Sequence, residues 1–369
     1  MKKLIILGVF ITLAMACANT QNNDIKTCRY KDRKGNYDLE ECYAGKVKSV
    51  KETSYEVVYK FGKITKGKKD VCEIIKFDNK GNKIEEYIYG TDGTLSYKEI
   101  YKYDDKGNKI EECYYYSDDS KSNDKYIYKY DNKGNKTEEY GYEYDGSLSD
   151  KYIYKYDNKG NMIEKCVYFS DGSLSDKYIY KYDDKGNKIE ECRYNFDGSL
   201  VDKSIFKYNN KGNNIEECHY NSDDSLIYKN VFKYDDKGNN IEVCLYDSDV
   251  SLYYKYIYKY DNKGNNIEEC GYKSDGSLGH KYIYKYDDKG NMIEECNYYD
   301  GKLLDSKYIY KYDNKGNMIE EYFYKSGSLD CKKKYNKYDN KGNWIEAIHY
   351  YDEAEIAEAI YIREIEYYE

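Results

Sequence analysis

The feature that most constrains this chain is a Lys-Gly-Asn string that returns at almost constant spacing. Its glycine, called the marker glycine below, recurs every 26 residues, with a single step of 27. A period of this length is typical of arrays in which each repeat is one supersecondary unit. We therefore expect one continuous array rather than several globular domains. The eleven marker glycines are Gly81, Gly107, Gly134, Gly160, Gly186, Gly212, Gly238, Gly264, Gly290, Gly316 and Gly342.

Each repeat has the pattern of a β-hairpin. In residues 255–280 tyrosines first alternate with lysine and isoleucine, which predicts a strand. The following Asp-Asn-Lys-Gly predicts a tight turn that ends with Gly264 in the left-handed region. Residues 266–272 then form the return strand, and an Asp-Gly turn leads into the next copy. The chain has 55 tyrosines and no proline, which suits an uninterrupted ladder of strands.

The expected fold class is therefore all-β, with tandem 26-residue hairpins in a long antiparallel meander. About 22 strands would make a sheet roughly 105 Å across, and the sequence leaves open whether it coils or stays a single-layer ribbon. A three-residue turn predicts that the strand tyrosines share one face with Cys270 and Tyr272, while Ile257 and Ile267 share the other. A two-residue turn would instead place Ile267 with the tyrosines. The glycine at the third turn position favours the first register.

The Tyr-Asp-x-x-Gly core and the tyrosine-rich face resemble the YD repeats of the RHS family across residues 76–343. Asn follows the glycine here, where that family often has Arg. The resemblance implies a β-shell around a C-terminal toxic domain, yet we expect residues 344–369 to form cap strands and to leave no room for such a domain. Residues 26–75 are expected to be a diverged repeat with cap strands at the other end.

The first 25 residues have the pattern of a secretion signal. A basic start precedes the apolar stretch Leu4–Met15, which is too short to span a bilayer, so residues 1–16 are expected to be a signal peptide. Ala16 before Cys17 resembles a bacterial lipoprotein signal, although Ala14 stands where that family prefers Leu. The resemblance implies lipidation of Cys17, a tether over residues 17–25 and an outer-membrane lipoprotein of the bacterial envelope, facing the periplasm or the cell surface. The alternative is an ordinary signal peptide with an incidental cysteine.

The cysteines are better explained by packing than by chemistry. At the position six after the marker glycine, Tyr87, Tyr140 and Tyr322 replace the cysteine of other repeats. Equivalent strands would be ~9.6 Å apart, whereas a disulfide needs Cα atoms within ~7 Å. We expect buried thiols there, with no metal and no cofactor. The cysteines of this position are Cys113, Cys166, Cys192, Cys218, Cys244, Cys270 and Cys296; those off the pattern, some of which could pair, are Cys28, Cys42, Cys72 and Cys331.

No catalytic constellation is visible in the sequence. The consecutive glutamates of each repeat would point to opposite faces of the sheet. His219, His280 and His349 occupy unrelated repeat positions and have no evident nucleophile partner. A net charge of −9 argues against nucleic-acid binding, which needs clustered cations. We therefore expect a protein that is not an enzyme.

The tyrosine face remains as the candidate binding surface. Tyrosine rings can stack on sugars or contact proteins, but they can also simply hold the sheet together. We predict a non-enzymatic envelope lipoprotein, held on the membrane by its lipid, whose sheet is an interaction or adhesion surface for a protein or a glycan. The alternative is an RHS-like shell or scaffold around a passenger protein, which a closed lumen would favour. The candidate residues are Tyr154, Tyr156, Tyr180, Tyr182, Tyr256, Tyr258, Tyr260, Tyr284 and Tyr286.

Overall fold

The computed structural model describes residues 27–29, 41–117, 124–300, 303–352 and 356–369, so the signal segment, Cys17 and the tether lie outside the described residues. The predicted all-β hairpin meander is confirmed. The strands are β1 Thr27–Arg29, β2 Glu41–Tyr43, β3 Val47–Lys60, β4 Lys63–Phe77, β5 Lys83–Tyr89, β6 Leu95–Tyr103, β7 Lys109–Tyr116, β8 Lys125–Tyr130, β9 Lys136–Tyr142, β10 Leu148–Tyr156, β11 Met162–Phe169, β12 Leu174–Tyr182, β13 Lys188–Asn195, β14 Leu200–Tyr208, β15 Asn214–Asn221, β16 Leu226–Tyr234, β17 Asn240–Tyr246, β18 Leu252–Tyr260, β19 Asn266–Lys273, β20 Leu278–Tyr286, β21 Met292–Tyr299, β22 Leu303–Tyr312, β23 Met318–Lys325, β24 Ser328–Tyr338, β25 Trp344–Tyr351 and β26 Ile356–Tyr367.

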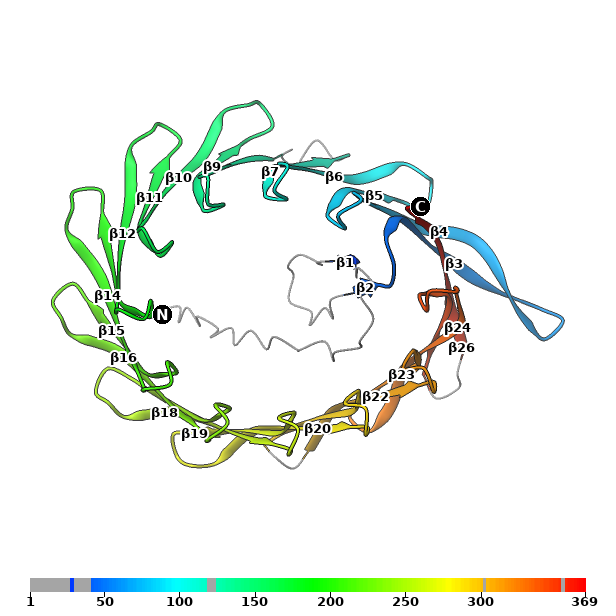
Figure 1. The fold of residues 1–369 in the computed structure, drawn as a ribbon. Coiled ribbons are helices and arrows are strands. Elements are labelled where there is room, and N and C mark those ends of the chain that lie inside the picture. Colours follow the sequence, from blue (N-terminus) through cyan, green and yellow to red (C-terminus); the bar gives the residue numbers. More distant parts are fainter. Residues whose placement is uncertain (1–26, 30–40, 118–123, 301–302, 353–355) are drawn as a thin grey trace, which may run out of the picture.

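The sheet closes on itself into a ring. Strands β3 to β26 pair in chain order, and the last of them, β26, pairs with β3 (Figure 1). The structure thus decides what the sequence left open, since the single-layer sheet is neither a flat ribbon nor an open spiral. In the described part of the chain the ring has 24 strands, which at ~4.8 Å each gives a diameter of about 37 Å before strand tilt is added. A ring of this width exceeds what one layer of side chains can fill.

The recurring residues of the first turn hold its backbone in place. Gly264 has φ +89°, the left-handed conformation that the sequence predicted. Asp261 and Asn265 pair across the turn, and the Asp261 carboxylate accepts hydrogen bonds from the Lys263 and Asn265 amides at 2.8 and 2.9 Å. The Lys263 ammonium reaches the next turn and donates to the Asp288 carbonyl at 2.7 Å. The Asp-x-x-Gly-Asn string is therefore structural, and it also ties successive repeats together.

The predicted register is correct at the turn but wrong further along the strand. Tyr260 pairs with Asn266 as expected, but a β-bulge follows, in which Ile267 is the extra residue. Beyond it Tyr258 pairs with Glu269, and Ile257 pairs with Cys270. Because one extra residue exchanges the two faces, the cysteine lies with isoleucine and lysine and not with the tyrosines.

The tyrosine face is the inner face of the ring. Strand β2 lies inside the ring (Figure 1), and its Tyr43 packs against Phe77 with ring centroids 6.1 Å apart. Phe77 occupies the position four before its marker glycine, which is tyrosine in the later repeats. Side chains at four, six and eight residues before each marker glycine therefore point inward, because strand residues alternate between faces.

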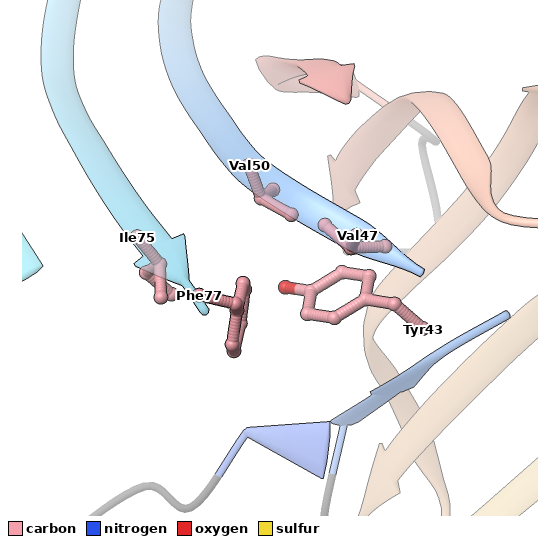
Figure 2. Packing of buried hydrophobic residues seen from close by; sticks show 5 residues of the cluster. All are labelled: Tyr43, Val47, Val50, Ile75 and Phe77. Atoms are coloured by element: carbon pink, nitrogen blue, oxygen red, sulfur yellow. The ribbon is translucent and has the colours of Figure 1, made fainter. Parts of the chain in front are cut away.

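The main hydrophobic cluster, which we call the seam cluster, lies beside the closure, where Ile365 and Tyr367 of β26 pack against it. It joins Val47 and Val50 of β3 with Ile75 and Phe77 of β4, and Tyr43 lies over them (Figure 2). All five side chains are at most 2% exposed. The seam is also hydrogen-bonded, since the Asn343 side chain exchanges two bonds with the Ala44 backbone at 2.7 and 2.9 Å, and the Tyr368 hydroxyl donates to the Phe77 carbonyl at 2.6 Å. The strands expected at the two ends of the array thus meet each other.

The outer face is a regular lattice of ion pairs. Glu268 accepts from Lys259 of its own hairpin at 2.6 Å and from Lys281 of the next hairpin at 2.7 Å. The cysteines of the array lie beneath this lattice as free, buried thiols, as predicted. Of the cysteines off the pattern, Cys72 and Cys331 are also free, while Cys28 and Cys42 are register partners in the separate sheet of β1 and β2.

Candidate functional site: the inner wall

The candidate tyrosines predicted from the sequence all lie on the inner wall, on strands β10, β12, β18 and β20. They differ in what their hydroxyl groups do. The tyrosine four before the marker glycine donates to a backbone carbonyl of the preceding repeat, as Tyr260 does to Asn240 at 2.9 Å and Tyr286 does to Asn266 at 3.0 Å. This carbonyl belongs to the residue beside the bulge. Tyr156, Tyr182, Tyr260 and Tyr286 therefore have a structural role.

The tyrosines six before the marker glycine form a band that is partly exposed at Tyr154 and Tyr284 and buried at two positions. Tyr180 and Tyr258 are 9% and 8% exposed, and burial raises the pKa of both phenols, so they stay protonated. The tyrosines stack along the strand, as Tyr256 does on Tyr258 with centroids 6.4 Å apart. Tyr154 also donates to Glu139 at 3.0 Å. This band lines the interior with rings rather than with free hydroxyl groups.

Two outer positions of the repeat are uniform, whereas one pair of inner positions differs between repeats. On the outer face the residue four after every marker glycine is Glu and the residue eight after it is Tyr, in all eleven repeats. On the inner face the pairs formed by the residue eight before and the residue seven after the glycine differ from repeat to repeat. We call them the variable belt: Glu73–Ile88, Glu99–Tyr114, Tyr126–Gly141, Tyr152–Val167, Tyr178–Arg193, Ser204–His219, Asn230–Leu245, Tyr256–Gly271, Tyr282–Asn297 and Tyr308–Phe323.

Two of the histidines have partners in or next to this belt that sequence reasoning missed. The Ser204 hydroxyl lies 2.8 Å from His219 Nδ1. The Tyr254 hydroxyl lies 3.0 Å from His280 Nδ1, and His280 Nε2 lies 3.7 Å from Glu269. The members of each group come from different strands, so their association depends on a register that the bulge alters. Neither group alone establishes a catalytic site, because hydroxyl–imidazole pairs of this kind also satisfy buried polar atoms.

Lysines on the inner wall sit in aromatic and acidic cages. Lys136, two after its marker glycine, lies 5.4 and 5.1 Å from the ring centroids of Tyr128 and Tyr154 and 2.6 Å from Glu139. The rings come from two successive repeats, and the glutamate lies five after the glycine. These distances are typical of cation–π contacts supported by an ion pair. We call the two rings and the carboxylate a lysine cage.

The same cage recurs around the first half of the ring. Lys109 is held by Tyr101 and Tyr128, each 5.3 Å away, and it pairs with Glu112. Lys188 lies 4.6 Å from the ring of Phe206 and 5.7 Å from that of Tyr180. In β5, Glu86 and Glu99 raise the pKa of Lys83, although burial alone would lower it. The cage thus stabilises a positively charged ammonium group at the wall.

Other kinds of site are not apparent in the described ranges. Across them no group of three or more His, Cys, Asp or Glu side chains could hold a metal ion. Within the same ranges there is no helix whose length and apolar character would let it cross a membrane.

Three solved structures illustrate what the fold is similar to. The crystal structure of TcdB2-TccC3 matches with a TM-score of 0.37 and 10% identity, covering 82% of this chain and 20% of that one. The Photorhabdus luminescens Tc holotoxin pore matches with a TM-score of 0.27 and 11% identity, over 78% of this chain and 19% of that one. A porin-like protein from Bacteroides uniformis matches with a TM-score of 0.28 and 8% identity, over 87% and 98% of the two chains.

These likenesses are too low to carry an inference about function. The chain spans about a fifth of the length of the toxin chains that it matches. No protein-family model matches the sequence, and no curated protein matches it.

Proposed function

We propose that this protein is a non-enzymatic scaffold whose ring holds a partner polypeptide against its inner wall. The observation that carries the proposal is the contrast between the repeated Lys–Glu lattice of the outer face and the variable belt inside a closed ring. A face that only supports the sheet can repeat the same residues, as the outer Lys–Glu lattice does. A face that recognises an irregular partner needs different side chains in each repeat, and a rigid framework to present them.

The resemblance to the RHS family supports the same proposal, since it implies a β-shell around a passenger. The alternative function, adhesion through an exposed tyrosine sheet, is less well supported because the candidate tyrosines point into the ring.

For location we propose the bacterial cell envelope, with an anchor at Cys17. If so, Cys17→Ser moves the protein from the membrane fraction to the soluble fraction, whereas unchanged fractionation contradicts the anchor.

The scaffold is tested by site-specific photo-crosslinking in the cells that produce the protein. A photoreactive residue at Tyr256 reports on the inner wall, and one at Tyr272 in the same repeat reports on the outer face. We expect a discrete polypeptide adduct from position 256 and none from position 272. Equal labelling at both positions, or an adduct only from position 272, contradicts a partner inside the ring.

A further inference from the structure

The lysine cage is complete in only part of the ring. In the repeat of Gly264 the two rings, Tyr258 and Tyr284, and the carboxylate, Glu269, are all present, but Asn266 stands where the cage lysine would be. The next repeat has Tyr284, Tyr310 and Glu295, with Met292 in the lysine position. We call these two sites, in which both rings are tyrosines, the lysine-free cages; the repeat of Gly212 instead has Phe206, Phe232 and Glu217, with Asn214 in the lysine position. Across the described residues no salt bridge joins a lysine to Glu269 or Glu295.

The walls of these two cages match those that hold a lysine elsewhere. Tyr258 pairs with Glu269, and Tyr284 pairs with Glu295, as Tyr101 pairs with Glu112 around Lys109. The Asn266 side chain does not replace the ammonium group, because its oxygen accepts from the Glu268 amide at 3.1 Å and is thereby tied to its own strand. The carboxylate stays within reach, since Glu269 is 21% exposed and Glu139, in a complete cage, is 19% exposed.

The carboxylates of the lysine-free cages also differ in charge environment from those of the complete cages. Burial raises the pKa of Glu295, which has no lysine partner, so an added ammonium group would be favoured there. Glu269 has a nearby imidazole, His280, at 3.7 Å, which is a weaker partner than the lysine of a complete cage. In the complete cages, by contrast, the ammonium group of the chain itself neutralises the carboxylate.

We propose that the two lysine-free cages bind lysine side chains of the partner polypeptide, an inference that rests on the proposed function and specifies its partner. The chain itself shows which group these walls accept, because rings and carboxylates at the equivalent positions of other repeats hold Lys109, Lys136 and Lys188. The two cages share Tyr284 and lie two ladder steps apart, ~9.6 Å. In a polyproline II segment, side chains three residues apart lie on the same side and ~9.3 Å apart, so the expected motif is Lys-x-x-Lys.

The test fills the cages with the lysine that other repeats carry. We would measure binding of a fluorescent peptide Lys-Gly-Gly-Lys-Gly-Gly-Lys to the full chain and to the double variant Asn266→Lys with Met292→Lys. We expect the double variant to lose about tenfold or more in affinity, since it loses two charge-assisted cation–π contacts. A double variant that binds the peptide as the wild type does overturns the inference.

Two controls separate the cages from general attraction to an acidic protein. Asn262→Lys adds a positive charge on the exposed turn of the same repeat and should change the affinity less than twofold. The peptide with acetylated lysines should not bind. An equal loss for Asn262→Lys overturns the cages as the site. Thermal unfolding of the double variant should match the wild type, because the substitution copies a complete cage that the chain already forms three times.

The result is distinguishable from a failure of the scaffold itself. If position 256 crosslinks a partner but the peptide does not bind, the lysine cages are wrong and the scaffold stands. If the peptide binds through the cages but no partner crosslinks inside the ring, the chemistry of the cages stands and the scaffold is wrong.

Discussion

The seam and the repeat wall are stabilised in different ways. The seam buries valine, isoleucine and phenylalanine at 2% exposure or less, as an ordinary core does. The wall has no such cluster among its described residues, and it relies on tyrosine rings inside, lysine–glutamate pairs outside and hydrogen bonds between turns. Each wall repeat contacts only its neighbours, so its stabilising contacts are local and recur. Closure, however, depends on contacts that occur once.

The largest effect is therefore expected at the seam. Phe77→Ala removes a fully buried ring beneath Tyr43 and should lower the free energy of unfolding by about 3–5 kcal/mol. Chemical denaturation gives the value, and small-angle scattering would show whether the ring opens. Phe196→Ala, at a side chain 72% exposed in an Asp-Gly turn, is the control and should change little. Equal losses for the two variants would contradict the special role of the seam.

Acid should weaken the wall more than the seam cluster. Burial alone would raise the pKa of Glu242, but the hydrogen bonds from Lys233 and Lys255 lower it to about 2. A carboxyl group whose pKa is lower in the folded state contributes stability above its unfolded value, near 4.5, and loses it as the pH falls toward 2. The pKa values of Glu216, Glu268 and Glu294 are lowered as well.

The measurement is the denaturation midpoint as a function of pH. It should fall steadily between about pH 4.5 and pH 2, and Glu242→Gln should make that fall smaller. The Phe77→Ala variant should show the same pH slope as the wild type, because the seam cluster contains no carboxyl group. A midpoint that stays constant down to pH 2.5 would show that the lattice does not stabilise the ring.

A smaller loss is expected when one inward hydroxyl is removed. Tyr260→Phe keeps the ring but leaves the Asn240 carbonyl without its donor, which should lower the free energy of unfolding by about 1 kcal/mol. Urea titration resolves such a difference. Tyr299→Phe, at a side chain 62% exposed, is the matched control with no expected change. If both variants equal the wild type, the inter-repeat hydrogen bond does not hold the bulge in place.

The sequence predicted the parts of this fold that depend on neighbours within one repeat. The period, the two turns and the shared face of the strand tyrosines follow from strand alternation and from the marker glycines. The bulge at Ile267 could not be predicted. A change in the length of the turn and an extra residue in the strand both shift the pairing by one residue, and the alternation of residues in the sequence is the same in either case. Closure did not follow either, since it depends on curvature summed over the whole sheet and on a seam between residues such as Val50 and Ile365.

The lysine cages were hidden for the same reason. Lys136 is close to Tyr154 in space but belongs to a different repeat, and the corrected register brings Glu139 to the same face. The variable belt could have been found from the sequence, since position seven after the glycine changes in nearly every repeat. The sequence alone does not show that this position faces the interior. That follows only from the closed ring in the structure.

The smallest change in the free energy of unfolding is expected for a cysteine substitution in the wall, and the same substitution at the seam provides the comparison. In the wall, Cys192 occupies a position that is tyrosine in three other repeats, where the hydroxyl donates to a glutamate, as Tyr322 does to Glu320 at 2.7 Å. Cys192→Tyr should therefore change the free energy of unfolding by less than about 0.5 kcal/mol. Cys72, in β4 at the seam, is 2% exposed and has no such precedent, so Cys72→Tyr should cost about 1–3 kcal/mol through overpacking. Equal costs at the two cysteines would mean that the wall is packed as tightly as the seam, and that its repeats do not tolerate exchange of residues at equivalent positions.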